Sequence, residues 1–250
     1  ELFFSFLFEA IGCAILGVFV NVAKREALVM VLLPLLAFIP HLFAWRVSMA
    51  HLNPAVSLAN LLRRDVDFNI VQFLVYVFAQ FAGFFGGMYI VWWLERSVGQ
   101  LDIWQDGGNT WQYHESIAME FFGSFVFVLI HLLSTHRNTS LSANWGVNAL
   151  VVGGFYGALI EWGQDYAGGS FNPAYGSMHN LVDLFDDGED ESIEFVWIYI
   201  VFPFLGALVS WALYDFIYRP AYEVTPSKQT DVYKPEDEIV ELGQGHPHGY

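Results

Sequence analysis

The tripeptide Asn-Pro-Ala occurs twice in this chain, as Asn53-Pro54-Ala55 and as Asn172-Pro173-Ala174. The two copies are 119 residues apart, and each lies within apolar sequence. Asn is a preferred N-cap residue, Pro fits the first helical position because it has no N–H, and Ala continues a helix. Each tripeptide therefore predicts the start of a helix.

A helix that starts inside a membrane places free N–H groups and the positive end of its dipole in a medium of low dielectric constant. Such a start is tolerated where it lines a cavity, so two of them predict a pore. If each Asn oxygen caps its own helix, the amide nitrogen can donate a hydrogen bond into the lumen. The two facing dipoles repel cations and protons, which predicts a filter for neutral solutes.

The composition is typical of an integral membrane protein, because 55% of the residues are hydrophobic, 18% are aromatic and only 14% are charged. A helix needs about 20 apolar residues to cross about 30 Å of hydrocarbon. Six apolar runs are read as such spans: residues 2–22, 27–45, 70–94, 117–133, 147–162 and 193–217. The predicted fold class is an all-α membrane protein with six transmembrane helices and two re-entrant half-helices.

The two halves of the chain, about 1–95 and 115–220, resemble each other in an ordered way. Residues 9–12 correspond to residues 120–123, the two tripeptides correspond, and residues 79–83 correspond to residues 202–206. Because each half has three spans, an odd number, the second half must enter the membrane upside down. Half-helices over residues 54–63 and about 173–182 would each be about 15 Å long and would meet at the midplane.

Six spans also place both termini on the same side of the membrane. Six basic residues fall on that side and three on the other, which favours cytosolic termini. The net charge of −16 is concentrated in residues 183–194 and in the last thirty residues. We therefore expect a channel domain over residues 1–220 and a disordered acidic tail over residues 221–250.

The heptapeptide at residues 50–56, Glu9, Glu120 and the segments 202–204 and 214–216 resemble motifs of the aquaporin, or major intrinsic protein, family. The resemblance covers roughly residues 2–220. It implies a homotetramer in a lipid membrane, with one pore per subunit that passes water or small neutral solutes. It also implies that Glu9 and Glu120 are buried structural residues, hydrogen-bonded to the loop backbone behind each half-helix.

The chain departs from the family at the outer constriction. Tyr175 follows the second tripeptide, where most water-selective aquaporins have Arg. The other constriction positions correspond to Leu33, Ile160 and Gly169, so the resemblance implies an apolar, uncharged constriction. This could widen the pore and admit glycerol, hydrogen peroxide or ammonia. Alternatively, the Tyr175 ring could fill the lumen, with its hydroxyl bonded to a backbone carbonyl, leaving a gated or structural subunit of a larger membrane assembly.

Two further polar residues precede the first half-helix. Arg46 is costly in lipid and must face water or a partner, either as a pore-side cation or as a head group that reaches a carbonyl or Glu. His51 could contact solute or support the loop.

The acidic segment matches a calcium-binding loop in part, with candidate ligands at Asp183, Asp187, Glu189, Glu191 and Glu194. Phe185 occupies a ligand position, so a solvated acidic rim is the favoured interpretation. No paired nucleophile and base, phosphate-binding Gly loop or Cys/His cluster is present in the sequence. An enzyme is therefore disfavoured, and no cofactor, resident metal or nucleic-acid partner is expected.

Overall fold

The computed structural model describes residues 1–24, 28–98, 101, 111–136, 139–187 and 191–224. Within these ranges the regular elements are all helical. The helices are α1 Leu2–Lys24, α2 Val29–Ser48, α3 Pro54–Leu62, α4 Ile70–Glu95, α5 Trp111–Thr135, α6 Trp145–Ala167, α7 Pro173–Asp187, α8 Glu191–Glu194, α9 Val196–Leu213 and α10 Arg219–Val224, with the π-helical turn η1 Tyr214–Tyr218 joining the last two.

Six long helices correspond to the six predicted spans. Of the described helices, α1, α2, α4, α5 and the run from α9 into α10 are long and apolar enough to cross a membrane. Helix α6 is less apolar, since it carries Asn148, Glu161 and Gln164, but its 23 residues extend over about 35 Å. Large apolar side chains cover the outside of the bundle; Met30, Phe78 and Leu28 are 75%, 68% and 68% exposed. Such a surface is suited to lipid, and the chain is an integral membrane protein.

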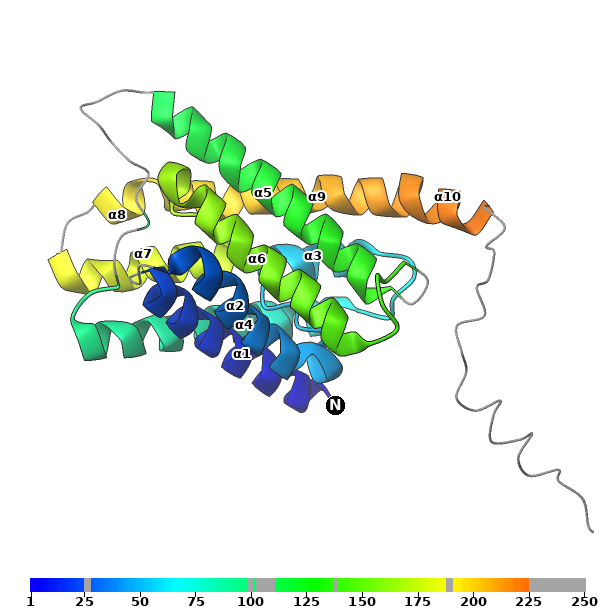
Figure 1. Ribbon diagram of the computed structural model, residues 1–250, viewed down its shortest axis with the longest axis horizontal. Helices are drawn as coiled ribbons and strands as arrows, with labels where there is room; N and C mark the ends of the chain where they lie inside the picture. Colours follow the sequence, from blue (N-terminus) through cyan, green and yellow to red (C-terminus); the bar gives the residue numbers. More distant parts are fainter. Residues whose placement is uncertain (25–27, 99–100, 102–110, 137–138, 188–190, 225–250) are drawn as a thin grey trace, which may run out of the picture.

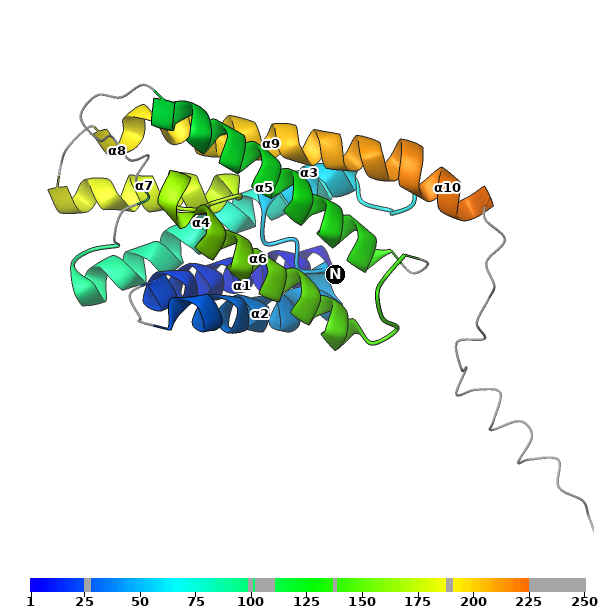
Figure 2. The ribbon, with the colours of Figure 1, turned by 45° about the horizontal axis from the view of Figure 1, so that its top comes forward.

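The helices form two structurally equivalent halves in an inverted repeat. Helix α1 packs against α4 in the first half, and α5 packs against α9 in the second. Helices α2 and α6 pack against each other and join the halves. Each half-helix also packs against the last long helix of the other half, α3 against α9 and α7 against α4. Figures 1 and 2 show α3 and α7 end to end along the long axis of the bundle.

Two glycines let the first and last long helices of each half touch. A Cβ atom on Gly83 would lie 2.2 Å from the Ala10 carbonyl oxygen, and one on Gly206 would lie 2.5 Å from the Phe121 carbonyl oxygen. Contacts this short with backbone atoms exclude any larger residue. The two sites are equivalent in the repeat, because Ala10 and Phe121 directly follow the two repeated glutamates.

Four predicted boundaries are wrong. Helix α6 ends at Ala167 instead of residue 162, just before the left-handed Gly168. Helix α5 begins at Trp111 instead of residue 117, because a polar turn without Gly or Pro precedes the apolar run. Helix α7 has 15 residues, about 22 Å, and continues past residue 182 to Asp187, just before Gly188. The expected disordered tail is helical as far as Val224 in α10. The rest of that tail, residues 225–250, lies outside the described residues.

Candidate functional site

The two Asn-Pro-Ala tripeptides meet where α3 and α7 begin. Asn53 Oδ1 accepts a hydrogen bond from the Ala55 N–H at 2.8 Å, and Asn172 Oδ1 accepts one from the Ala174 N–H at 3.1 Å. Each Asn therefore caps its own half-helix, as its residue type predicts. The tripeptides also join the two halves, because Asn53 Nδ2 donates to the Phe171 carbonyl oxygen across the junction at 2.8 Å.

The reciprocal bond is present too: Asn172 Nδ2 donates to the Leu52 carbonyl oxygen at 2.8 Å. An amide nitrogen has two hydrogens, so each Asn keeps one N–H that these bonds do not use. The sequence predicted that the amide nitrogen donates a hydrogen bond into the lumen. The structure uses one of its two hydrogens to tie the opposing loops together.

The residue before each capping Asn has a left-handed backbone. Leu52 has φ 46° and Phe171 has φ 52°, which is costly for residues with a side chain. This conformation turns each loop sharply into its half-helix. Their side chains approach equivalent glycines, since a Cβ atom on Gly12 would lie 2.7 Å from Leu52 and one on Gly123 would lie 2.2 Å from Phe171.

Two buried glutamates hold these strained loops. Glu120 accepts hydrogen bonds from the backbone N–H groups of Ser170 and Phe171, both at 2.8 Å. Glu9 makes the equivalent pair of bonds and has two further donors. Its partners are His51 N at 3.0 Å, Leu52 N at 2.8 Å, Ser48 Oγ at 2.6 Å and Gln80 Nε2 at 2.6 Å. Each carboxyl group therefore satisfies the N–H groups of a loop that cannot form helix or strand bonds.

Tyr175 lies on the α7 side of the junction, in the first turn of that half-helix. Its ring is 1% exposed and contacts the rings of Phe84 at 5.6 Å and His179 at 5.9 Å between centroids. Its buried hydroxyl has no hydrogen-bond partner in the part of the chain that the structure describes. The expected bond to a backbone carbonyl is thus not present there. Tyr156 makes such a bond instead, donating to the Ser170 carbonyl oxygen at 2.8 Å.

The other expected constriction positions are also buried. Gly169 has φ 63°, and a Cβ atom on it would lie 2.4 Å from the Ile160 carbonyl oxygen. A side chain at this position would therefore be both strained and too close. Leu33 packs against α6 as well, where a Cβ atom on Gly157 would lie 2.4 Å from its carbonyl oxygen.

The structure adds Lys24, which is one of the three basic residues predicted to lie on the side of the membrane away from the termini. Lys24 Nζ donates to the Gly168 carbonyl oxygen at 2.6 Å and lies 5.7 Å from the centroid of the Tyr175 ring. The spacing along α1 was the available signal for this position. Lys24 follows the interior residues Asn21 and Val20 by three and four positions, and residues at these spacings share one helix face.

Three buried histidines lie in the same half of the bundle as the loop that precedes α3. His51 Nδ1 is 3.1 Å from Ser57 Oγ, and its ring packs against those of Phe68 and Tyr76, so His51 supports the loop. His131 contacts the His51 ring at 5.7 Å, and its Nε2 is 3.2 Å from the Met49 carbonyl oxygen.

His41, the third histidine, has its Nδ1 2.7 Å from the Ala37 carbonyl oxygen, and its ring lies 6.1 Å from that of Tyr156. His41 Nε2 and His131 Nδ1 are buried and have no partner among the described residues. The sequence analysis did not single out His41 or His131. Both histidines lie within apolar runs of the sequence, and that position was the available signal that they are interior residues.

Arg46 lies in the last turn of α2. Its side chain is exposed, and its guanidinium carbon lies 5.5 Å from the centroid of the Trp145 ring at the start of α6. Trp145 is itself 41% exposed. The guanidinium group therefore interacts with an aromatic face, and the pore-side role of Arg46 stays a prediction.

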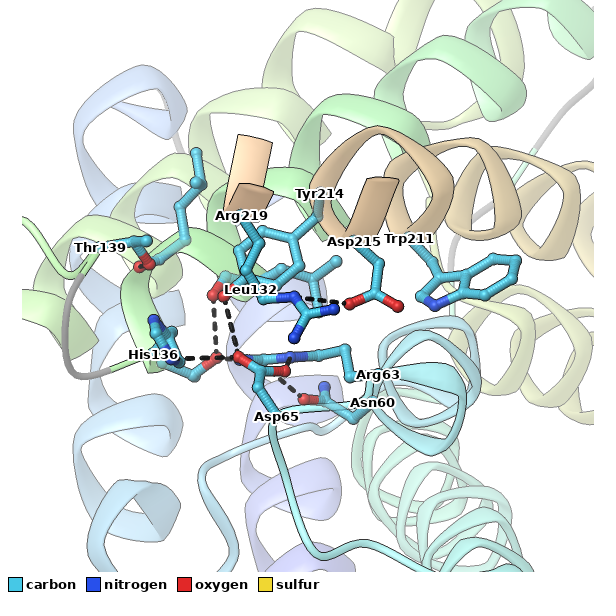
Figure 3. A network of polar contacts seen from close by, with 12 residues as sticks. Asn60, Arg63, Asp65, Leu132, His136, Thr139, Trp211, Tyr214, Asp215 and Arg219 are labelled. Carbon is cyan, nitrogen blue, oxygen red and sulfur yellow. Dashed lines mark hydrogen bonds and ion pairs between the residues drawn. The ribbon is translucent and has the colours of Figure 1, made fainter. Parts of the chain in front are cut away.

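A polar network fixes the other end of half-helix α3 (Figure 3). Arg63, which follows α3, donates from Nε and Nη2 to the two Asp65 carboxylate oxygens at 2.9 and 2.8 Å. Tyr214 Oη donates to Asp65 at 3.0 Å, and His136 Nε2 lies 3.2 Å from the same oxygen. Burial by itself raises the pKa of Asp65, but the hydrogen bond and charge of Arg63 outweigh it and lower that pKa to about 2.

A second ion-pair group lies beside this network. Asp215 in η1 lies 3.3 Å from Arg64 and 3.1 Å from Arg219, as Figure 3 shows for Arg219. Trp211 Nε1 donates to the Leu62 carbonyl oxygen at 2.9 Å and satisfies a free carbonyl at the end of α3. These contacts tie the short helix to α9 and keep its N-terminus at the junction.

The calcium-loop candidates do not form a loop. Asp183 and Asp187 lie in α7, Glu191 and Glu194 lie in α8, and Glu189 is outside the described residues. A calcium loop needs a non-helical backbone that converges its oxygens on one point. Among the described residues, no three His, Cys, Asp or Glu side chains converge on a point that could hold a metal ion.

The chain is similar to proteins of known family. A family model described as Major intrinsic protein matches residues 1–214. Aquaporin-1 of Bos taurus is 30% identical over 183 residues, 70% of this chain and 60% of that protein. The glycerol uptake facilitator protein of Streptococcus pneumoniae (strain ATCC BAA-255 / R6) is 29% identical over 178 residues, 66% of this chain and 73% of that protein.

The chain therefore spans about 60% of the length of the Aquaporin-1 sequences that it matches. Among solved structures, the aquaglyceroporin from Plasmodium falciparum has a similar fold, with a TM-score of 0.74 at 21% identity. The match covers 90% of this chain and 100% of that chain.

Proposed function

The chain belongs to the major intrinsic protein family, and on that premise we propose that it forms a passive transmembrane channel for water and small neutral solutes. The observation that carries the proposal is the junction of α3 and α7. Two capped helix N-termini meet there, held by reciprocal hydrogen bonds from Asn53 and Asn172. Two positive dipole ends at one point repel cations, while each Asn keeps one N–H for a solute oxygen.

Unpartnered buried polar atoms on both sides of the junction support the same proposal. They are the Tyr175 hydroxyl on the outer side and the His41 and His131 nitrogens on the other. The Tyr156 ring lies 6.1 Å from the His41 ring, and Tyr156 also interacts electrostatically with Tyr175. A buried polar atom without a partner costs roughly 1–3 kcal/mol. A file of permeating water or polyol hydroxyls would satisfy all three.

The solute class follows from the walls at the outer side. Leu33 and Ile160 are apolar, so a polyol can pass its carbon face along them and its hydroxyls along the Asn amides. The named relatives include both an aquaporin and a glycerol facilitator. We propose that this chain passes glycerol-sized solutes as well as water. The same proposal includes a homotetramer, cytosolic termini and no enzymatic activity.

A second candidate is a gated or structural membrane subunit whose lumen is filled by Tyr175. The specific observation in its favour is that the Tyr175 ring is only 1% exposed and contacts Phe84 and His179. A ring that crosses a lumen about one water wide would stop flux. The two candidates differ in what removal of this ring does.

The experiment is reconstitution into liposomes with stopped-flow light scattering under a sucrose gradient and a glycerol gradient. Under the channel proposal, shrinkage and glycerol re-swelling are faster than in empty liposomes. Tyr175→Ala then changes water flux by less than about twofold, whereas a large gain from a closed wild type favours the gated subunit. Tyr89→Ala, which deletes a 43% exposed ring from α4, is the matched control. If neither wild type nor Tyr175→Ala conducts, the channel proposal fails.

A further inference from the structure

Lys24 is on the interior face of α1, although it is the last residue of that helix. Val20, Asn21 and Ala23 beside it are 0%, 2% and 0% exposed, whereas Val22 is 40% exposed. The Lys24 side chain itself is only partly buried. Its position therefore directs the ammonium group into the bundle and away from lipid.

The contacts of Lys24 converge on the outer constriction. Its Nζ donates to the carbonyl oxygen of Gly168, the left-handed residue that ends α6, and lies 5.7 Å from the centre of the Tyr175 ring. The carboxyl groups of Glu120 and Glu161 also interact with it electrostatically. An ammonium group has three donors, so the bond to Gly168 leaves two for other partners.

We propose that Lys24 is the specificity-determining cation of the outer constriction, supplying a positive charge and hydrogen-bond donors beside Tyr175. This inference rests on the proposed channel function. The expected constriction residues carry no charge; they are Leu33, Ile160, Gly169 and Tyr175. The ammonium group of Lys24 therefore gives the outer constriction a positive charge that these residues lack. A neutral solute receives hydrogen bonds from the ammonium group, whereas a cation at this point meets like charge.

A purely structural role is the alternative, because Lys24 also binds the carbonyl end of α6, where a cation is favourable. Lys24→Gln separates the two roles. The Gln side chain keeps a donor for the Gly168 carbonyl oxygen but removes the charge. Lys24→Met removes both, and Lys24→Arg keeps both. Arg96→Met is the matched control, since Arg96 is an exposed cation at the end of α4 whose guanidinium carbon lies 5.4 Å from the Trp92 ring centroid.

The experiment measures two fluxes through the full chain in liposomes. Light scattering reports glycerol flux, and an enclosed pH-sensitive dye reports proton leak driven by a potassium gradient with valinomycin. We expect Lys24→Gln and Lys24→Met to raise the ratio of proton leak to glycerol flux by about tenfold or more. Lys24→Arg and Arg96→Met should keep the wild-type ratio. Thermal unfolding in detergent shows whether Lys24→Gln remains folded.

The outcomes separate the two proposals. If wild type conducts glycerol and the Lys24→Gln ratio equals that of wild type, the role of Lys24 is overturned and the channel function stands. The role of Lys24 is also overturned if Arg96→Met raises the ratio of proton leak to glycerol flux by the same amount. Any positive charge near this mouth would then keep protons out. No flux through wild type or any Lys24 variant overturns both proposals.

Discussion

Replacement of Glu120 by Gln tests the idea that the buried carboxyl groups hold the junction loops. The change keeps the shape of the side chain but turns one acceptor oxygen into an NH₂ donor. Ser170 N and Phe171 N each face one carboxylate oxygen. Whichever way the Gln amide is turned, one of these two backbone N–H groups meets another donor.

Glu9→Gln should have nearly the same effect despite the larger number of contacts at Glu9. Ser48 is a hydroxyl that can turn and accept, and Gln80 has a buried Oε1 without a partner among the described residues. Both side chains can therefore adapt to the new NH₂ group. The backbone N–H groups of His51 and Leu52 cannot, so one of them again loses its acceptor.

A buried N–H that loses its acceptor costs roughly 1–3 kcal/mol. For a chain of this size, 1 kcal/mol shifts the midpoint of thermal unfolding by roughly 2–4 °C. We therefore expect Glu9→Gln and Glu120→Gln each to lower that midpoint by roughly 2–12 °C in detergent. The measurement is thermal unfolding followed by circular dichroism, with water permeability measured in parallel.

Glu115→Gln is the matched control, because Glu115 lies on the same helix as Glu120 but is exposed. It should leave the midpoint within about 1 °C of wild type, as is usual for surface substitutions. Midpoints of Glu9→Gln and Glu120→Gln that equal the control would refute the reasoning. A much larger loss for Glu9 than for Glu120 would show that Ser48 and Gln80 do not adapt.

Two further predictions concern the helix contact and the α3 network. Gly83→Ala should destabilise the fold by more than about 2 kcal/mol, because its Cβ would lie 2.2 Å from the Ala10 carbonyl oxygen; Gly86→Ala, with no atom within 4 Å, should have little effect in the same unfolding assay. Asp65→Asn should lower stability at pH 7 by roughly 1–3 kcal/mol, since it removes the charge that pairs with Arg63 at 2.8 Å in an ion pair whose side chains are only 0% and 10% exposed. Because the folded pKa of Asp65 is about 2, below its ordinary value near 4, this difference should be full above about pH 4 and vanish as the pH falls toward 2. Unfolding midpoints of wild type and variant at pH 7, 5 and 3 check this, and a difference that grows at low pH contradicts it.

Much of the architecture could be predicted because it depends on local sequence. Asn53 and Asn172 cap α3 and α7 through bonds to N–H groups only two residues further along the chain. The equivalence of Glu9 with Glu120 was visible because the repeat preserves residue type and order. Helix boundaries were less predictable where apolar sequence gives way to polar sequence, as in α5 and α7, because a helix continues past the membrane until a breaker stops it.

The roles of single charged residues could not be predicted in the same way. Arg46 and Lys24 both stand near helix ends in apolar sequence, yet Arg46 is exposed over the Trp145 ring, whereas Lys24 reaches the Tyr175 ring. The side of a helix that faces the interior depends on how it packs, and six apolar helices have similar faces all round. The position of Lys24 beside Tyr175 could therefore not be read from the sequence.

The sequence alone determined that the chain crosses a membrane, that two half-helices begin at the Asn-Pro-Ala tripeptides and that the halves are inverted. These features follow from hydrophobic length and from capping, which act over a few residues. Only the tertiary structure decided which groups meet at the junction and at the constriction. Asn53 and Phe171 are 118 residues apart, and Lys24 and Gly168 are 144 residues apart. Such contacts exist only once the packed helices have brought the two halves together.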